Sequence, residues 1–213
     1  MQNSSLDDMI EVGIDEAGRG CLSGRVYTAA VILPEEYPDD TYLQINDSKK
    51  LSIKKRNELR RYIESVAVDW KVEYADLEEI EEKNILHATI AAMHRAVDKL
   101  DVDPDNILVD GNYFKQYKDS HGIIIPHQTV EKGDTKFRNI AAASILAKVY
   151  HDEHVLDMLE QDPECEKYGW RTNMCYATKA HRDAIKAHGI TKFHRKTFGI
   201  CKDYCVEKTK DES

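Results

Sequence analysis

The chain has 213 residues, which is long enough for one domain with a substantial hydrophobic core. Hydrophobic residues make up 41% of it and charged residues 32%, a composition typical of soluble globular proteins. Lysine and arginine number 30 against 39 aspartate and glutamate, so the net charge of −9 argues against nucleic acid as a partner on total charge alone.

The sequence carries no sign of a membrane or export segment. No stretch approaches the roughly 18 uninterrupted apolar residues of a membrane span, and the N-terminal "MQNSSLDDMI" is too polar and acidic for a signal peptide. We therefore expect a cytoplasmic protein with no membrane partner. Five cysteines without a C-x-x-C pair fit reduced thiols there. A zinc site from the last four would have spacings that match no common finger: Cys165, Cys175, Cys201 and Cys205.

The first half of the chain predicts three strands and two helices. "MIEVGI" and "RVYTAAVIL" are rich in β-branched and apolar residues and flank a glycine-rich loop. Ser52 is a good N-cap for a helix to about Val66, and "VAVDWKVEYA" alternates like a strand. After an acidic helical turn, "NILHATIAAMHRAVDKL" predicts an amphipathic helix. Its apolar stripe consists of Leu86, Ile90, Met93, Val97 and Leu100.

The second half predicts short strands, one long helix and one short helix. "NILVDGN" predicts a strand ending on Asp110, and "GIIIPHQTVEKGD" two further extended pieces. "FRNIAAASILAKVYHDEHVLDMLEQD" predicts a long, partly buried helix that Pro163 stops. "TKAHRDAIKAHG" predicts a short helix ending at Gly189. Strands alternating with helices indicate an α/β fold, and the two adjacent N-terminal strands indicate a mixed sheet.

Basic residues are concentrated in two places despite the acidic total. "NDSKKLSIKKRNELRRY" covers residues 46–62, and the range 171–202 holds a single acid, Asp183. Either run alone fits a solvated helix face, but the two runs also fit two basic surfaces on a mostly acidic protein. The basic residues of the second run are Arg171, Lys179, Arg182, Lys186, Lys192, Arg195, Lys196 and Lys202.

Acidic residues stand at the ends of predicted core elements. Asp15 and Glu16 end the first strand, Asp110 ends another, and Asp134 stands just before the buried helix. Each alone fits a turn, a cap or a polar strand end. If the two strands are neighbours, however, three or four carboxylates converge, and such a cluster requires cations. Oxygen ligands favour Mg²⁺ or Mn²⁺, and two such ions about 4 Å apart are a known arrangement for phosphodiester hydrolysis.

A bare loop, "GRG", follows the first pair of acids. Its glycines permit a polymer backbone to approach closely and expose N–H donors, and Arg19 offers a partner for phosphate. The chain contains neither a G-x-G-x-x-G nor a Walker A pattern, so a nucleotide cofactor is not expected.

Eight sequence blocks occur in the order seen in type 2 ribonuclease H, also called ribonuclease HII: "GIDEAGRG", "NDSKKLS", "NILHATIAAMHRAV", "LVDGN", "VEKGD", "AAASILAKV", "YATKAH" and "HRKTF". The chain resembles that family from about residue 10 to about residue 200. The resemblance implies a ribonuclease H-like α/β fold with a five-stranded mixed sheet, flanking helices and a small helical C-terminal part. It implies one catalytic domain, 1–213, in which 164–213 form a basic helical subdomain.

The resemblance also implies the reaction. Members of the family are metal-dependent endoribonucleases (EC 3.1.26.4) that hydrolyse the RNA strand of RNA/DNA hybrids and incise at single ribonucleotides in duplex DNA. They use two Mg²⁺ or Mn²⁺ ions and leave 3′-hydroxyl and 5′-phosphate ends. The family's catalytic, metal-binding acids correspond to Asp15, Glu16, Asp110 and Asp134.

Substrate-binding residues follow from the same resemblance. Gly18, Arg19 and Gly20 correspond to the loop that recognises the ribose 2′-hydroxyl at an RNA–DNA junction, the group that separates RNA from DNA. Tyr176 corresponds to the tyrosine that packs against the sugar of the next deoxynucleotide. Lys49 is expected to contact a phosphate of the duplex.

The chain departs from the family pattern in three places. After "GRG" the family usually has Pro-Leu-Ala-Gly-Pro, whereas this chain has "CLSGR", and the loss of two prolines predicts a looser loop. "NMC" precedes Tyr176 where the family tends to have a Lys-Gly pair. His151 and Asp152 replace the usual Arg-Asp, and Asp152 is expected to cap or to pair with a basic group.

Three alternatives remain beside this interpretation. A binding protein of the same fold that had lost catalysis would be expected to lose one of the four acids, and all four are present. Type 3 ribonuclease H carries an N-terminal substrate-binding domain, for which Asp15 stands too near the start. A phosphatase that acts on small substrates is less favoured, because such a substrate would not need the two basic surfaces. As partners we expect RNA/DNA hybrid and ribonucleotide-containing duplex DNA. We also expect a monomer, without a clamp-binding peptide, because the tail "EKTKDES" lacks an aromatic pair.

Overall fold

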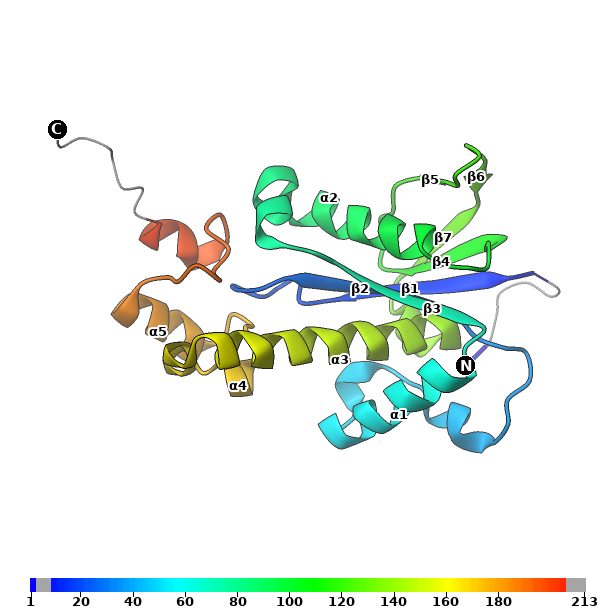
Figure 1. The fold of residues 1–213 in the computed structure, drawn as a ribbon, viewed down its shortest axis with the longest axis horizontal. Coiled ribbons are helices and arrows are strands. Elements are labelled where there is room, and N and C mark those ends of the chain that lie inside the picture. The colour runs from blue at the N-terminus through cyan, green and yellow to red at the C-terminus, as the bar shows by residue number, and fades with distance from the viewer. Residues whose placement is uncertain (3–8, 206–213) are drawn as a thin grey trace.

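A five-stranded sheet forms the centre of the computed structural model, which describes residues 1–2 and 9–205 (Figure 1). The strand order is β3-β2-β1-β4-β7. β1, β2 and β3 form an antiparallel meander, whereas β4 and β7 run parallel to β1, which confirms the predicted mixed sheet. The strands are β1 Glu11–Ala17, β2 Val26–Ile32, β3 Asp69–Ala75, β4 Asn106–Asp110 and β7 His127–Val130.

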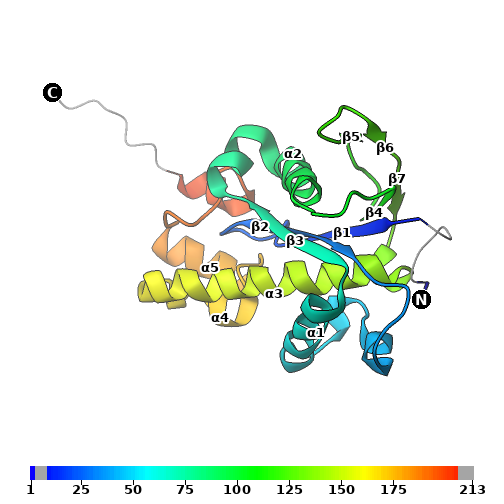
Figure 2. The same cartoon turned by 45° about the vertical axis from the view of Figure 1, so that its right-hand side comes forward.

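Helices cover both faces of this sheet (Figures 1 and 2). α1 (Ile53–Val66) and α3 (Arg138–Gln161) pack against one face, and α2 (Leu77–Asp98) packs against the other. α1 begins where the sequence predicts, because the Ser52 hydroxyl accepts a hydrogen bond from the Lys55 N–H at 3.2 Å. None of the described helices is long and apolar enough to cross a membrane.

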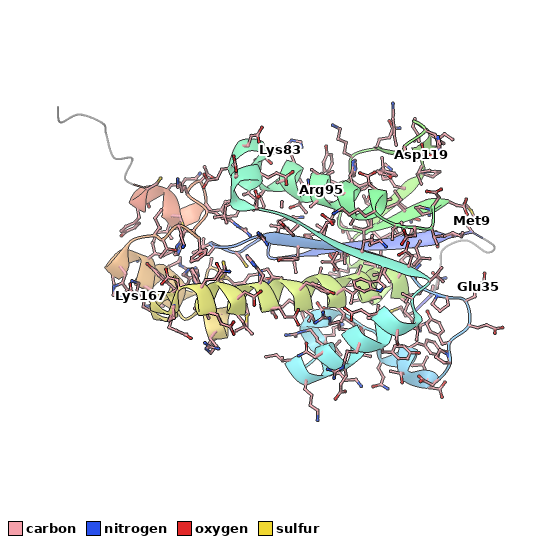
Figure 3. All side chains as sticks on the ribbon, viewed as in Figure 1. Met9, Glu35, Lys83, Arg95, Asp119 and Lys167 are labelled. Carbon is pink, nitrogen blue, oxygen red and sulfur yellow. The ribbon has the colours of Figure 1, made fainter. Side chains whose placement is uncertain are left out.

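α2 consists of two segments that meet at Asn84. This residue has a φ of 66°, and its side chain accepts the N–H groups of Leu86 and His87 at 3.0 and 3.2 Å, so it caps the second segment. Glu79 of the first segment pairs with Arg95 of the second, whose side chain is labelled in Figure 3. The prediction for Leu86 was wrong: it is 38% exposed, because it lies in the first turn after the break rather than on the buried stripe.

The contact between β1 and α3 is unusually close. A Cβ on Gly13 would lie 2.2 Å from the backbone carbonyl carbon of Asn139. The Asn139 side chain fixes the same contact, because its Nδ2 donates to the Glu11 carbonyl at 2.9 Å and its Oδ1 accepts the Leu33 N–H at 3.3 Å. Glycine in β1 therefore lets the buried helix lie directly on the central strand.

Short helices and strands complete the structure. The three 3-10 helices before α3 are η1 Asp40–Gln44, η2 Ser48–Lys50 and η3 Gly133–Thr135. A separate two-stranded sheet pairs β5 Tyr117–Lys118, which the sequence did not predict, with β6 Ile124–Ile125, which lies in the predicted extended stretch "GIIIPHQTVEKGD". After α3 come η4 Pro163–Tyr168, α4 Trp170–Asn173, α5 Lys179–His188 and η5 Gly199–Tyr204.

The C-terminal helices gather around an apolar cluster of their own, at the left of Figure 1. Cys21 and Leu22, from the loop between β1 and β2, belong to this cluster. The C-terminal part is therefore packed directly onto that loop. The assignment of 164–213 as a subdomain stays a prediction, and the tail "EKTKDES", expected to lack a clamp-binding peptide, lies outside the described residues.

A pair of neutral histidines lies inside the C-terminal cluster. The Trp170 Nε1–H donates to His181 Nε2 at 3.0 Å, so His181 carries its proton on Nδ1, 3.1 Å from the Tyr176 carbonyl. The Thr191 N–H donates to His194 Nδ1 at 2.9 Å, so His194 carries its proton on Nε2, 3.3 Å from His181 Nε2. Burial lowers the pKa of His181, and burial lowers that of His194 to about 3.

We predict that the free energy of unfolding falls as the pH drops below about 6.5, where histidines of the unfolded chain take up protons. The folded state does not take up these protons, so His194, whose pKa in the folded protein is about 3, costs about 2 kcal/mol of stability between pH 7 and pH 5. His181, whose pKa is also lowered, adds to this loss. Urea unfolding of the wild type and of His194→Gln at both pH values measures the effect. The variant should lose less stability on acidification, and an equal loss in both proteins would contradict the prediction.

Candidate active site at the ends of β1 and β4

β1 and β4 deliver two acids to the same edge of the sheet. The strands are parallel with Ile14 opposite Val109, so Asp15 and Asp110 occupy the next, adjacent positions. Asp110 is also held from the other side, because its Oδ1 accepts the Gly133 N–H at 2.7 Å. The two acid-bearing strands are therefore neighbours, which is the condition that the sequence analysis set for the acids to converge.

Asp134 reaches the same region from η3. Lys132 precedes that helix in the left-handed conformation, with a φ of 54°, and turns the chain back toward Asp110. Asp134 is only 5% exposed, and its carboxyl shares a hydrogen bond with Asp47. Asp47 also accepts the Lys49 N–H at 2.9 Å, so the loop that carries Lys49 is fixed beside the acids.

The four carboxylates act on one another electrostatically. Burial raises the pKa of Asp15 well above its usual value, and Glu16 and Asp110 raise it further. Burial and Asp110 also raise the pKa of Glu16, against the opposing charges of Arg19 and Lys49. Burial and Asp110 raise the pKa of Asp134 in the same way. The protein's own cations therefore leave this cluster with an excess of negative charge.

The donor set fits hard divalent cations. All four groups offer oxygen, the ligand that Mg²⁺ and Mn²⁺ prefer. Within residues 1–2 and 9–205, no three acidic, histidine or cysteine side chains stand ready around a metal position. Local partners hold the carboxylates instead: the Glu16 N–H donates to Asp15 at 2.7 Å, and Arg19 pairs with Glu16 at 3.0 Å.

The cysteines form free thiols rather than a metal centre. Cys165, Cys175 and Cys201 are buried without a disulfide, and Cys205 is partly buried. No cysteine of the described part belongs to a group that could hold a metal ion, so the zinc alternative has no support in the structure.

The glycine loop begins one residue after β1 ends. Gly18 has a φ of +90°, and a Cβ there would lie 2.4 Å from the His151 ring, so its glycine is a structural requirement. Gly20 is different: its φ is outside the left-handed region, and a Cβ would meet only the Tyr176 ring at 3.9 Å. The Arg19 side chain is 52% exposed and lies on Glu16. The structure thus places the loop between the acids and Tyr176.

A basic cavity of about 460 Å³ opens beside Tyr176. Arg56, Lys148 and Arg171 contribute to its lining, and the Lys148 ammonium lies 5.2 Å from the centre of the Tyr176 ring. Burial raises the pKa of Tyr176, so its hydroxyl stays protonated at neutral pH. The side chains of this cavity come from α1, α3 and α4, elements that are far apart in the sequence.

Asp152 pairs with two of these basic residues, Arg56 and Lys148, in agreement with the expectation that it has a basic partner. It accepts a hydrogen bond from Lys148 at 2.6 Å and lies 3.0 Å from His151 Nδ1 and 3.5 Å from Arg56 Nη2. His151 in turn lies 3.5 Å from the Cys21 sulfur, within the glycine loop. Asp152 therefore joins the loop to the lining of the cavity.

The two basic runs are more heavily paired than their sequences indicate. Arg171 pairs with Glu166 at 2.5 Å, and Lys179 and Lys186 both reach Asp183. The assignment of Arg195 to a surface is wrong, because this residue is fully buried beneath the glycine loop. Sequence reasoning missed its role, and the only local signal is the block "HRKTF" in which it stands.

Sequence comparison matches the same range of the chain. The Ribonuclease HII family model matches residues 12–201. The chain is 51% identical to the ribonuclease HII of Bacteroides fragilis over 201 residues, which are 94% of each protein. It is 52% identical to the ribonuclease HII of Parabacteroides distasonis over 191 residues, which are 90% of each protein.

Solved structures share the fold. The ribonuclease H2 of Pyrococcus horikoshii OT3 aligns with a TM-score of 0.73 at 22% identity, over 92% of this chain and 97% of that one. Bst-RNase HIII in complex with Mn²⁺ aligns with a TM-score of 0.71 at 19% identity, over 94% and 70% of the two chains. These likenesses confirm the ribonuclease H-like fold, and the sequence relatives decide between the types. The chain belongs to the ribonuclease HII family and is an endonuclease and hydrolase of that class (EC 3.1.26.4).

Proposed function

We propose that this protein hydrolyses the RNA strand of RNA/DNA hybrids and incises duplex DNA at single ribonucleotides, leaving 3′-hydroxyl and 5′-phosphate ends. The observation that carries this proposal is that Asp15 and Asp110 occupy adjacent positions on β1 and β4, beside the glycine loop and Tyr176. Asp110 also acts electrostatically on Glu16 and Asp134. Acids that repel one another suit a metal-dependent nuclease, and a bare loop suits contact with a sugar–phosphate backbone.

In this proposal the four acids hold two Mg²⁺ or Mn²⁺ ions. Bound ions would activate water and stabilise the leaving oxygen. Support comes from the oxygen-only donor set and from a ribonuclease HIII of the same fold that binds Mn²⁺. The protein orients the acids: Ser144 hydrogen-bonds Asp15, and the Gly133 N–H holds Asp110.

Cations of the protein then assist the substrate phosphates. Lys49 adds positive charge close enough to oppose part of the rise in the pKa of both Glu16 and Asp134. Arg19, which pairs with Glu16 in the free protein, is half exposed and free to turn to a phosphate. The basic cavity beside Tyr176 is suited to the phosphates of the bound duplex, whose contacts position it without reading sequence.

The glycine loop and Tyr176 would recognise the ribose. Gly20 has no structural need to be glycine, since a methyl group would fit there in the free protein. We infer that the space in front of it is kept for the substrate. Backbone groups of the loop would bind the 2′-hydroxyl, and the Tyr176 ring would pack against the next sugar.

Cytoplasmic residence is part of the same proposal. Burial raises the pKa of Cys21 to about 12 and that of Cys165 and Cys201 to about 11, so these thiols stay protonated and poorly reactive. Free buried thiols suit a reducing compartment. The monomeric state stays a prediction.

The test of the proposal is cleavage of a labelled DNA duplex that contains one ribonucleotide, in Mg²⁺, in Mn²⁺ and in chelator. Metal-dependent incision on the 5′ side of the ribonucleotide, with an all-DNA duplex left intact, is the expected result. Cleavage of long hybrids alone would show that the protein does not incise at single ribonucleotides. Cleavage of neither substrate would favour a binding protein of the same fold.

Asp110→Asn should reduce cleavage by at least a thousandfold at saturating substrate. The change keeps size and removes one of the charges that hold metal, so chemistry fails while duplex binding, which depends on the basic residues, survives. Single-turnover cleavage and duplex affinity in chelator are measured together. Cleavage at the wild-type rate would contradict the metal assignment.

Gly20→Ala should leave the melting temperature within about 2 °C of the wild type, because the new methyl group meets nothing closer than 3.9 Å. The same methyl group occupies the approach to the ribose, so kcat/KM for the single-ribonucleotide duplex should fall at least tenfold. Gly18→Ala is the contrasting variant, since its clash of 2.4 Å lowers stability as well. Full activity of Gly20→Ala would show that the substrate does not use this space.

A further inference from the structure

Arg195 is a fully buried residue around which the glycine loop is folded. A guanidinium group has five N–H donors, and in this structure each one donates to a main-chain carbonyl oxygen of the loop. Nε donates to Gly24 at 2.9 Å, Nη1 to Arg19 and Cys21 at 3.1 and 2.8 Å, and Nη2 to Gly18 and Arg25 at 2.8 and 3.1 Å.

This arrangement fixes the direction of the peptide groups in the loop. The C=O and N–H of one trans peptide point in opposite directions. Because the carbonyls of Gly18 and Arg19 turn inward to Arg195, the N–H groups of Arg19 and Gly20 turn outward. Both of these residues are exposed, so the loop presents two donors to the side where the substrate would lie.

Further contacts hold Arg195 in place. Its own N–H donates to the Leu22 carbonyl at 2.8 Å, and the Gly24 N–H donates to the Phe193 carbonyl at 2.9 Å. The Phe198 ring lies under the guanidinium, 5.2 Å from its carbon. The segment around Arg195 therefore hydrogen-bonds to the loop at several positions along it. These contacts constrain a loop that lacks the two prolines of the family pattern.

We propose that Arg195 is a positioning residue for ribose recognition: its five hydrogen bonds set the orientation of the loop peptides that read the 2′-hydroxyl. The inference rests on the proposed function, because it concerns how the same site selects its substrate. Lysine cannot replace this group, since its three donors sit on one nitrogen and cannot span five carbonyls.

The test compares two substrates in the full-length wild type and in Arg195→Lys. In a uniform hybrid every nucleotide of the RNA strand has a ribose, so a displaced loop can still contact one. A lone ribonucleotide can bind the loop in only one position along the duplex. The ratio of kcat/KM for the single-ribonucleotide duplex to that for the hybrid should fall at least tenfold in the variant. A ratio within twofold of the wild type would overturn the inference, whatever the absolute activity.

Leu59→Ala serves as the matched control for lost stability. Leu59 is fully buried in α1, in a different apolar cluster from the loop, so this variant should be destabilised with an unchanged ratio. A fall in the ratio for Leu59→Ala equal to that for Arg195→Lys would also overturn the inference. If the wild type incises neither substrate, the proposed function itself fails, which is distinct from an active wild type with an unchanged ratio in the variant.

A measurement on the wild type keeps the inference testable if Arg195→Lys does not fold. The Nε–H resonance of Arg195, observed by NMR in chelator, should shift when a single-ribonucleotide duplex is added. The matching all-DNA duplex should leave it unshifted. The same response to both duplexes, or to neither, would show that Arg195 does not report on ribose binding and would overturn the inference.

Discussion

The close packing of β1 on α3 sets the position of Asp15 and of the glycine loop that follows β1. Gly13 lets the strand lie against the backbone of Asn139, and Ser144, farther along the same helix, hydrogen-bonds Asp15. β1 then ends and the chain enters the glycine loop, so Asp15 and Gly18 are three residues apart on one rigid segment. In the proposed function, Asp15 and Glu16 would hold metal and the loop would read the ribose, so one segment would fix the position of the cut relative to that sugar.

Buried charges of opposite sign lie near the two ends of the segment from Asp15 to the glycine loop, and the protein stabilises them in different ways. The carboxylates around Asp15 and Asp110 repel one another and are left with excess negative charge, which favours binding of cations. Arg195, by contrast, is buried with all five donors satisfied by carbonyl dipoles of the loop. In the proposed function the acids would gain cations as partners, whereas the carbonyls of the loop already have a partner in Arg195.

The sequence predicted the features that local patterns encode, and missed those that depend on distant contacts. The mixed sheet, the strands that carry Asp15 and Asp110, and the cap at Ser52 followed from periodicity, turn residues and resemblance. Leu86 lies off the buried stripe because Asn84 breaks the helix just before it. Arg195 was counted as a surface charge because its loop partners lie some 170 residues away, beyond any local pattern. The "CLSGR" loop, expected to be looser, derives its constraint from that distant residue.

The repulsion among the carboxylates can be measured directly as stability. Thermal unfolding of metal-free wild type should shift upward with added Mn²⁺ or Mg²⁺, because ions that bind only the folded state stabilise it. Asp15→Asn removes one repelling charge, so without metal it should melt above the wild type, and added metal should raise its melting temperature less. Two results together would contradict the account of this site as a cluster of acids that needs cations. They are a melting temperature of the wild type that neither ion changes, and an Asp15→Asn variant that melts below the wild type.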